Sequence, residues 1–365
     1  MEPIYVIGLM SGTSCDGVDA AIIKTDGLGI VTRHGGILCP YPISFQKELR
    51  QILGETVESP EILDIEKKLT KYHIQAVSQV LQKYSLRSDQ IRLIGFHGQT
   101  IAHQPLRKFT WQIGDAALLA RETGIDVVYN FRQCDVTNGG QGAPLVPIYH
   151  AALSRMLPKP IAIINIGGIA NVTWIGTTEE ELLAFDTGPG NGLLNDWCLR
   201  HVQQPMDYDG LLASHGSVSE RHIDSFMENP YLSKLPPKSL DRLSFSLDDF
   251  DDLSVNDGAA TLTALTAKTI ALSQKFFPKP VARWLIAGGG RHNPYMMRCL
   301  TKYLGGVVQP VDQLGWSADF LEAEAFAYLA CRSWRGLPIS YPGTTGVVKP
   351  LSGGQYIKGS GMKGF

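Results

Sequence analysis

The sequence has little that would point to a membrane or a nucleic acid. No uninterrupted apolar run approaches the ~20 residues needed to span a bilayer. The N-terminus, "MEPIYVIG", has no basic segment followed by an apolar run, so a signal peptide is not indicated. Lys and Arg number 33 and Asp and Glu 35, which gives a net charge of −2. Such a balance offers no bulk attraction to a polyanion or to a membrane surface, and neither is expected as a partner.

Paired cysteines are also missing. The chain has no Cys-x-x-Cys motif, which argues against a zinc site and against a disulfide framework. This usage fits a reducing compartment, and we expect a cytoplasmic protein. The six cysteines stand singly, at Cys15, Cys39, Cys134, Cys198, Cys299 and Cys331.

Two common signatures of nucleotide-binding folds are absent too. The chain has no G-x-x-x-x-G-K-[ST] P-loop, and no G-x-G-x-x-G fingerprint between a predicted strand and a following helix, so the usual nucleotide folds are not indicated. The composition is that of a globular protein, with 44% hydrophobic and 19% charged residues over a length of 365. That length exceeds one ordinary core, and two domains are expected.

Apolar runs and helical stripes alternate along the chain. Two strands are predicted at 4–10 and 18–24, and a helix is predicted to begin at Ser59-Pro60, with Ser as N-cap and Pro at the first helical position. One face of that helix carries apolar residues with helical spacing. They are Ile62, Ile65, Leu69, Tyr72, Ala76 and Val80.

The glycine-rich passage "TNGGQGAPLVP" marks the predicted domain boundary, because both halves of the chain open with two apolar runs around small residues. We therefore expect a duplicated α/β fold. Domain I would comprise residues 1–138 and a C-terminal segment from about 335 to 365, and domain II residues 139–334.

Three glycine turns follow apolar runs, at 11–19, 167–168 and 288–290. Without a Cβ the backbone can approach a phosphate closely, and consecutive N–H groups can bind an anion. Each turn alone could equally be a bulged hairpin. Three in one chain, with carboxylates inside or just after two of them, favour a nucleotide site.

The motif "GLMSGTSCDGVD" resembles the phosphate-binding hairpin of the anhydro-N-acetylmuramic acid kinases, within the superfamily of sugar kinases, actin and heat-shock chaperone ATPases. The similarity continues in order through "GFHGQT", "QIGD", "GGQGAPLVP", "NIGGIAN", "DTGPGN" and "AGGGRHNP". It implies two actin-like (ribonuclease H-like) domains with a central cleft that closes around ATP and a sugar. It also implies the reaction of 1,6-anhydro-N-acetylmuramic acid with ATP and water, which gives N-acetylmuramic acid 6-phosphate and ADP in cell-wall recycling.

The resemblance also implies the nucleotide site. The hairpin would wrap the ATP phosphates, Asp16 would hold Mg²⁺ through water, and Cys15 stands where the family leads us to expect leucine. The implied ATP-binding residues are Gly12, Thr13, Ser14, Cys15, Asp16, Gly17, Val18 and Asp19 in the hairpin, Gly167 and Gly168 in a second phosphate turn, and Gly288, Gly289 and Gly290 beside the adenosine.

Asp186 in "FDTGPGNG" is the predicted catalytic base. Opening the anhydro ring needs water at the anomeric carbon, and glycines at 188, 190 and 192 leave room for a bulky ligand beside this carboxylate. The resemblance points to the same residue. From the residues alone, an Asx-turn aspartate before a helix that starts near Gly192 is the stronger alternative.

The remaining candidates are substrate-binding residues with structural alternatives. His97, Gln99 and Thr100 are placed on a loop after a buried strand, although His97 could be a core histidine. Asp115 could contact sugar hydroxyls or cap the next helix. Two others complete the prediction: Arg132, beside the lactyl carboxylate or in an ion pair with Asp135, and Asn191, implied by the resemblance.

One further residue, Glu322, and two rival functions complete the interpretation. Glu322 shares a helical stripe with apolar residues, where a carboxylate needs a partner. The rivals are another small-molecule kinase of the same superfamily and a non-enzymatic, ATP-driven binding protein. A homodimer is compatible with the sequence.

Overall fold

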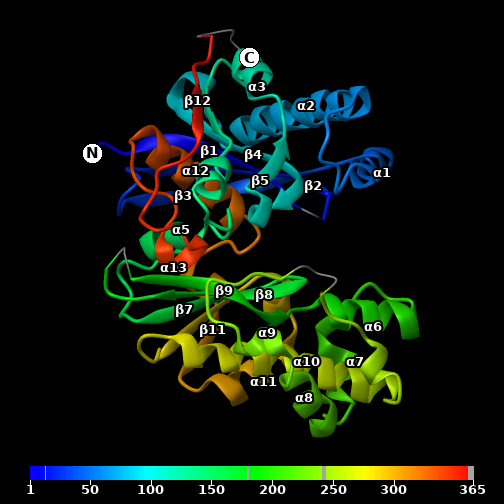
Figure 1. Ribbon diagram of the computed structural model, residues 1–365. Helices are drawn as coiled ribbons and strands as arrows, with labels where there is room; N and C mark the ends of the chain where they lie inside the picture. Colours follow the sequence, from blue (N-terminus) through cyan, green and yellow to red (C-terminus); the bar gives the residue numbers. More distant parts are fainter. Residues whose placement is uncertain (13, 179–180, 241–243, 361–365) are drawn as a thin grey trace. The chain divides into compact units, whose positions relative to one another are not determined.

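The chain forms two units. A computed structural model describes residues 1–12, 14–178, 181–240 and 244–360. Unit 1 comprises Met1–Met156 and Asp319–Phe365, and unit 2 comprises Leu157–Ala318 (Figure 1). The sequence-based boundaries, after 138 and before 335, differ from this division. Unit 1 extends beyond both of these boundaries because it includes α5 (Pro147–Leu153) and α12 (Leu321–Trp334), which contact each other.

A mixed sheet forms the centre of unit 1. Its strands lie in the order β12-β6-β4-β1-β2-β3, and β5 pairs with the far end of β4. β2 is antiparallel to both β1 and β3, whereas β4 is parallel to both β1 and β6. The strands are β1 (Ile4–Ser11), β2 (Gly17–Thr25), β3 (Val31–Pro40), β4 (Ile91–Gln104), β5 (Phe109–Ile113), β6 (Asp126–Tyr129) and β12 (Gln355–Ile357).

Helices cover both faces of this sheet. On one side α2 packs against β2 and β3, and on the other α12 packs against β1 and β4. α12 can approach the sheet closely because Gly8 and Gly95 have no Cβ. A Cβ at either position would overlap the backbone carbonyls of α12. Besides α5 and α12, the helices are α1 (Ile43–Gln51), α2 (Pro60–Lys83), α3 (Ala116–Thr123), α4 (Gln133–Thr137) and α13 (Pro342–Thr345).

The predicted start of α2 is confirmed. The Oγ of Ser59 accepts a hydrogen bond from the N–H of Ile62 at 3.2 Å, and Pro60 opens the helix. The predicted apolar stripe is buried except for Tyr72, which is partly buried against the same core. Local capping and periodicity were sufficient to place this helix.

Unit 2 has a five-stranded sheet in the order β11-β10-β7-β8-β9. β7, β8 and β9 are antiparallel neighbours, and β10 is parallel to β7 and β11. The strands are β7 (Ile161–Ile166), β8 (Ile169–Ile175), β9 (Leu182–Pro189), β10 (Arg283–Ala287) and β11 (Val307–Pro310). The helices are α6 (Gly192–Val202), α7 (Leu211–Ser214), α8 (Glu220–Met227), α9 (Pro230–Ser233), α10 (Val255–Leu272) and α11 (Pro294–Leu304).

The two sheets repeat one plan. In each unit the first three strands form an antiparallel meander, and two further parallel strands, β4 and β6 or β10 and β11, extend the sheet on the side of the first strand. β1, β2, β3, β4 and β6 therefore correspond to β7, β8, β9, β10 and β11. This confirms the predicted duplicated α/β architecture of the actin-like class.

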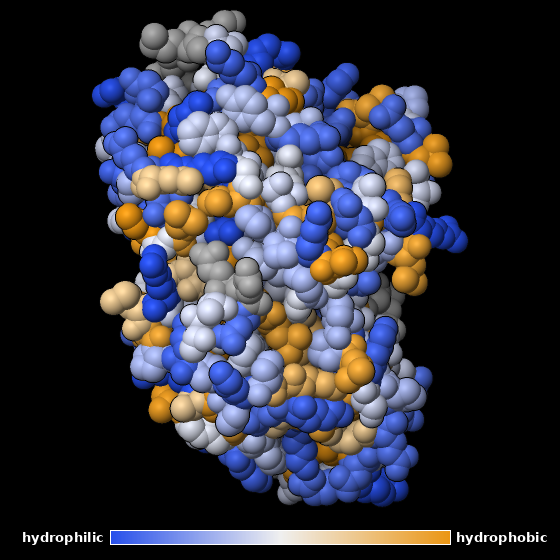
Figure 2. All heavy atoms as spheres, turned by 60° about the vertical axis from the view of Figure 1, so that its left-hand side comes forward, coloured by the Kyte–Doolittle hydropathy of each residue, from blue (hydrophilic) through white to orange (hydrophobic). Residues whose placement is uncertain are grey.

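The surface carries single apolar side chains among polar ones. Figure 2 shows hydrophilic side chains spread over one face, with hydrophobic ones between them. The most exposed of the large apolar residues, Leu106, Val348 and Met156, come from three separate segments, and such isolated exposure is ordinary for a folded protein. Within the described ranges, no helix combines the length and apolar character that crossing a membrane requires.

Candidate active site

The hairpin between β1 and β2 is held by its own backbone and by α1. The N–H of Cys15 donates to the carbonyl of Gly12 at 3.1 Å, the Oγ of Ser14 donates to Asp16 Oδ1 at 2.7 Å, and Arg50 donates to the carbonyl of Ser14 at 3.1 Å. Cys15 has a left-handed φ of 56° and is buried in the unit 1 core, so its thiol points away from the loop surface. Thr13 lies outside the described residues.

Carboxylates gather beside this hairpin. Asp16 is exposed and Asp19 is half-buried on β2. Burial, followed by the negative charges of Asp16, Glu322 and Asp319, raises the pKa of Asp19 to about 7. Glu322, at the start of α12, thus lies close enough to the hairpin to affect its electrostatics. Such a concentration of negative charge is the environment that a bound cation relieves.

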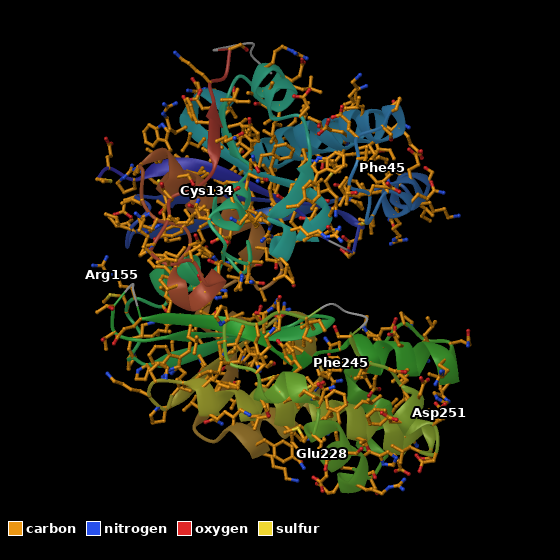
Figure 3. The ribbon with its side chains drawn as sticks, in the orientation of Figure 1. Phe45, Cys134, Arg155, Glu228, Phe245 and Asp251 are labelled. Atoms are coloured by element: carbon orange, nitrogen blue, oxygen red, sulfur yellow. The ribbon has the colours of Figure 1, made fainter. Side chains whose placement is uncertain are left out.

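A buried polar group supports the hairpin from below. The Oγ of Ser11 donates to Gln99 Oε1 at 2.5 Å and lies 2.9 Å from the hydroxyl of Tyr41. The ring of Tyr41 packs against Phe45, which is labelled in Figure 3, and against Tyr72, with 5.2 Å between centroids in each case. Gln99 is fully buried, so the structure places this predicted substrate residue inside unit 1, where it links β4 to β1.

The predicted polar loop after the buried strand is wrong. β4 continues to Gln104, because residues 99–104 pair with β5 (Gln99↔Ile113, Gln104↔Phe109). His97 and Thr100 therefore lie on a strand. Thr100 is half-buried and its Oγ1 accepts from Gln112 at 3.3 Å. A strand fixes these side chains more rigidly than a loop would.

His97 and Arg132 form a fixed pair. Arg132 Nε donates to His97 Nε2 at 3.1 Å, which leaves the His97 proton on Nδ1, 2.8 Å from the carbonyl of Gly98. Burial, followed by the charge of Arg132, lowers the pKa of His97 well below its ordinary value. His97 is therefore neutral and serves to orient the guanidinium. The core interpretation of this histidine fits its burial.

The alternative ion pair between Arg132 and Asp135 is wrong for the described residues. The carboxylate of Asp135 accepts from the N–H of Gly142 at 2.6 Å and from the hydroxyl of Thr345 at 2.5 Å. Arg132 Nη1 donates instead to the carbonyl of Gly142 at 2.7 Å. Nη2 of Arg132 has no hydrogen-bond partner in the described part of the chain, so one edge of the guanidinium remains available to a ligand.

A pocket of about 170 Å³ in unit 1 adjoins this pair. His97, Gly98, Gln112 and Gln133 are among the residues that line it. Asp115, on the turn after β5, caps α3, since its Oδ1 accepts from the N–H of Leu118 at 2.8 Å. The capping alternative for Asp115 is thus confirmed, and no described residue donates to its Oδ2.

In unit 2 the second glycine turn is bonded to the segment after β9. The carbonyl of Gly167 accepts from the N–H of Asn191 at 2.7 Å, and that of Gly168 accepts from Gly190 and Gly192, both at 3.0 Å. A Cβ on Gly190 would overlap the carbonyl of Gly167. Gly190 and Gly192 are therefore needed for this contact, and Gly168 stays exposed beside it.

The third glycine turn closes on the same place. Gly288 has a φ of 75°, and a Cβ on Gly290 would lie 2.5 Å from Ile166 Cγ2, at the end of β7. Gly289 is exposed, and the heavy atom nearest to a Cβ there is Asn191 Nδ2, 3.7 Å away. Segments far apart in the sequence thus meet in unit 2 and expose glycine backbone together, as a nucleotide site requires.

Asp186 lies on β9, beside a bulge in its pairing with β8. Its partner is Asn171, and the register shifts before Ala170 pairs with Gly188. Bulges of this kind re-aim side chains and are frequent beside active sites. The Oδ2 of Asp186 accepts from the N–H of Leu240 at 2.8 Å. The Asx-turn alternative is therefore wrong, because the carboxylate bonds to a distant segment rather than to its own turn.

Burial raises the pKa of Asp186 to about 6, although the N–H of Leu240 opposes the shift. No described residue donates a hydrogen bond to Oδ1. A half-buried carboxylate with one oxygen held and a pKa near neutrality has the properties of a general base.

A second pocket, of about 540 Å³ in unit 2, contains none of the predicted site residues. Its lining includes Asp251, labelled in Figure 3, and Asp252. These acids are paired, Asp251 with Arg200 at 2.6 Å and Asp252 with Arg221 at 2.5 Å. Among the described residues, no three side chains of metal-binding type come together as a metal site.

The duplicated sheets and the glycine turns after β1, β7 and β10 define a protein of the actin-like ATPase and sugar-kinase class. The family model for anhydro-N-acetylmuramic acid kinase matches residues 4–358. Relatives with that name include one from Rhizorhabdus wittichii, 47% identical over 360 residues, which span 97% of this chain and 99% of the relative. Another, from Rhodospirillum rubrum, is 44% identical over 355 residues, 97% of this chain and 94% of the relative.

The chain therefore belongs to the anhydro-N-acetylmuramic acid kinase family, and the resemblance drawn from its motifs is confirmed. It is an ATP-using kinase, not a non-enzymatic binding protein. Among solved structures, a ROK family glucokinase from Streptomyces griseus in complex with glucose and AMPPNP aligns with a TM-score of 0.42 and 12% identity, over 89% of this chain and 99% of that one.

Three features of the site were missed by the sequence analysis. Glu322 and Asp319 lie close enough to Asp19 to raise its pKa, and Leu240 binds the Asp186 carboxylate. Glu322 was noted as a carboxylate on an apolar stripe, but its neighbour could not be named. No local signal marks the other two.

Proposed function

We propose that this chain opens 1,6-anhydro-N-acetylmuramic acid with water and phosphorylates O6, with Asp186 as the only base. The observation that carries this assignment is the state of its carboxylate. Oδ2 is held by Leu240, Oδ1 is left without a donor among the described residues, and burial raises the pKa to about 6. Such a group is ionised at neutral pH and still basic enough to take a proton from water.

The bond changes balance without a second acid. Water attacks the anomeric carbon, and Asp186 accepts its proton. The bond from that carbon to O6 breaks, and O6 takes the electron pair. In ordinary glycoside hydrolysis a carboxylic acid protonates the leaving oxygen. Here O6 bonds to the γ-phosphorus of ATP, and ADP leaves, so the phosphoryl group takes up the developing charge.

The glycine turns would hold ATP. In unit 1 the hairpin of Gly12, Ser14, Asp16 and Asp19 would surround the phosphates, together with the glycine turns at 167–168 and 288–290 in unit 2. Gly168 and Gly289 are exposed and have no Cβ to keep a ligand away from the backbone. Thr13, Cys15, Gly17 and Val18 remain part of this proposal as hairpin residues.

The acids beside the hairpin fit a magnesium ion. Asp16 is exposed near Asp19, whose pKa is raised by burial and then by the charges of Asp16, Glu322 and Asp319. Mg²⁺ usually keeps several waters and binds one or two carboxylates together with substrate phosphates. Held at Asp16, it would neutralise phosphate charge during transfer.

The sugar side of the proposal rests on Arg132. His97 and the carbonyl of Gly142 fix its guanidinium, and the free Nη2 suits the lactyl carboxylate of the substrate. Thr100, Asp115 and Asn191 remain proposed contacts to the sugar, and Gln99 supports the hairpin instead. Because the reaction consumes ATP, we also propose a cytoplasmic location. A homodimer stays a prediction.

Turnover in ¹⁸O-labelled water tests the reaction directly. The label should enter the anomeric hydroxyl, observed before it exchanges, while the bridge from C6 to phosphorus stays unlabelled. The first anomer formed should be inverted, because water attacks opposite the departing O6. Label in the ester bridge, or retention of configuration, would contradict the assigned use of Asp186.

The pH dependence of turnover should show the ionisation of Asp186. Since the base works only when deprotonated, kcat should rise about tenfold per pH unit below its pKa and level off above about 6. Initial rates with both substrates saturating, from pH 4.5 to 8, measure this limb. A flat profile across that range would contradict a base with a raised pKa.

A further inference from the structure

The segment that follows α8 encloses Asp186. We call residues 230–240 the strap. It forms hydrogen bonds with the carbonyl, the N–H and the carboxylate of Asp186. The hydroxyl of Tyr231 donates to the carbonyl of Asp186 at 2.7 Å, and the N–H of Asp186 donates to the carbonyl of Lys238 at 3.1 Å. The N–H of Leu240 reaches Oδ2 at 2.8 Å. The orientation of the carboxylate therefore depends on the shape of the strap.

Lys238 closes the strap on itself. Its Nζ donates to the carbonyl of Tyr231 at 3.1 Å and, at 3.4 Å, to that of Leu232. Tyr231 and Lys238 both also bond to the backbone of Asp186. The hydrogen bonds thus form a closed ring, from Asp186 through Tyr231 and Lys238 back to Asp186.

The ammonium group of Lys238 is buried, and burial of a charge costs free energy. Lys238 is 5% exposed, and no carboxylate pairs with it among the described residues. The rings of Phe276, Tyr231 and Phe185 surround Nζ, with centroids at 4.5, 4.6 and 5.6 Å. Their faces and the two carbonyls offset part of the cost of burial. An apolar side chain such as Met would fill this box more cheaply, so packing alone does not account for a lysine here.

We propose that Lys238 is a positioning residue for the catalytic base. By binding the carbonyls of Tyr231 and Leu232, it fixes the strap so that Leu240 presents its N–H to Oδ2 of Asp186 and Oδ1 is left for the attacking water. This inference deepens the proposed function and rests on it. It assigns a role in catalysis to a side chain that makes no contact with the carboxylate.

Loss of this ring of hydrogen bonds should change the pKa of Asp186 in one direction. A hydrogen bond to the ionised form lowers a pKa, so a carboxylate that loses the N–H of Leu240 becomes harder to ionise. The phenol of Tyr231 is the other titratable group next to Asp186, and its pKa is raised by burial and then by the charge of Asp186. Burial, then Lys275 and Lys234, lowers the pKa of Lys238 to about 8.

Lys238→Met tests the proposal, with Lys234→Met as the matched control. Methionine fills the aromatic box without donating to the carbonyls. We expect kcat to fall about 10- to 100-fold, the cost of a misplaced catalytic group. The acid limb of kcat should move to higher pH, and KM for ATP should stay unchanged. Lys234 lies exposed in the same strap, and its variant should match the wild type. Lys238→Arg, which keeps the donors, should recover part of kcat.

Two results would overturn the inference. One is a folded Lys238→Met variant with wild-type kcat and an unmoved acid limb. The other is a loss of kcat in step with the fraction unfolded, again with the limb in place. If Lys238→Met does not fold, Tyr231→Phe breaks the same ring at its hydroxyl and should lower kcat and move the limb in the same direction. Normal Lys238→Met activity beside an inactive Asp186→Asn variant rejects the inference alone, whereas an active Asp186→Asn variant rejects the proposed function and the inference with it.

Discussion

Asp186→Asn should lower kcat by about 10²- to 10⁴-fold, the usual contribution of a general base, and should remove ADP and the sugar phosphate together. Asparagine keeps an oxygen that can accept from the N–H of Leu240, so the contact seen at 2.8 Å survives the change. What the variant loses is the negative charge that accepts a proton from water. Because O6 becomes a nucleophile only as the anhydro ring opens, hydrolysis and phosphoryl transfer should stop together.

The measurement follows ADP and the sugar product in parallel, with binding of ATP and of the sugar determined calorimetrically. Asp224→Asn is the matched control, since Asp224 is exposed on α8 in the same unit, and it should behave as the wild type. Thermal melting of both variants shows whether the fold is intact. ADP formation that still depends on the anhydro sugar at more than a few per cent of the wild-type rate would remove Asp186 from its role.

Local signals in the sequence were sufficient for the elements that carry the glycine turns. The Ser-Pro start of α2, the two runs around the hairpin and the Asn-Pro start of α11 all depend on contacts between residues close in sequence. For α11, the side chain of Asn293 accepts from the N–H of Tyr295 at 2.9 Å, a cap made within the Asn-Pro start of the helix.

Features that depend on pairing between distant segments could not be obtained in this way. The extension of β4 to Gln104 depends on β5, and polar residues such as His97 and Gln99 suggested a loop because neither the partner strand nor Ser11 could be identified beforehand. Glu322 follows Asp19 by some three hundred residues, yet it raises the pKa of that carboxyl. Lys238, in the stretch Pro236-Pro237-Lys238, had no pattern that indicated a buried amine.

The structure also separates two glycines that look equivalent in the hairpin motif. A Cβ on Gly17 would lie 2.6 Å from the carbonyl of Cys39, so a side chain there would push β3 away and destabilise unit 1. At Gly12 the nearest heavy atom to a Cβ is Ser14 Oγ, 3.7 Å away, and its φ is not in the left-handed region. A substitution at Gly12 therefore probes the space for a ligand, while one at Gly17 probes stability.

Gly12→Val should weaken ATP binding at least about tenfold, or about 1.4 kcal/mol, and leave the melting temperature and the affinity for the anhydro sugar close to the wild type. The valine methyl groups would extend into the space where the phosphate oxygens are proposed to lie, and they would restrict the backbone that presents its N–H groups. Gly12→Ala adds less bulk and should give an intermediate affinity. Gly17→Val is the contrasting control and should lower the melting temperature. Calorimetric titration with a non-hydrolysable ATP analogue measures the affinities on folded protein. An unchanged affinity in Gly12→Val would mean that the hairpin only reverses the chain, and the proposed phosphate site would have to lie elsewhere.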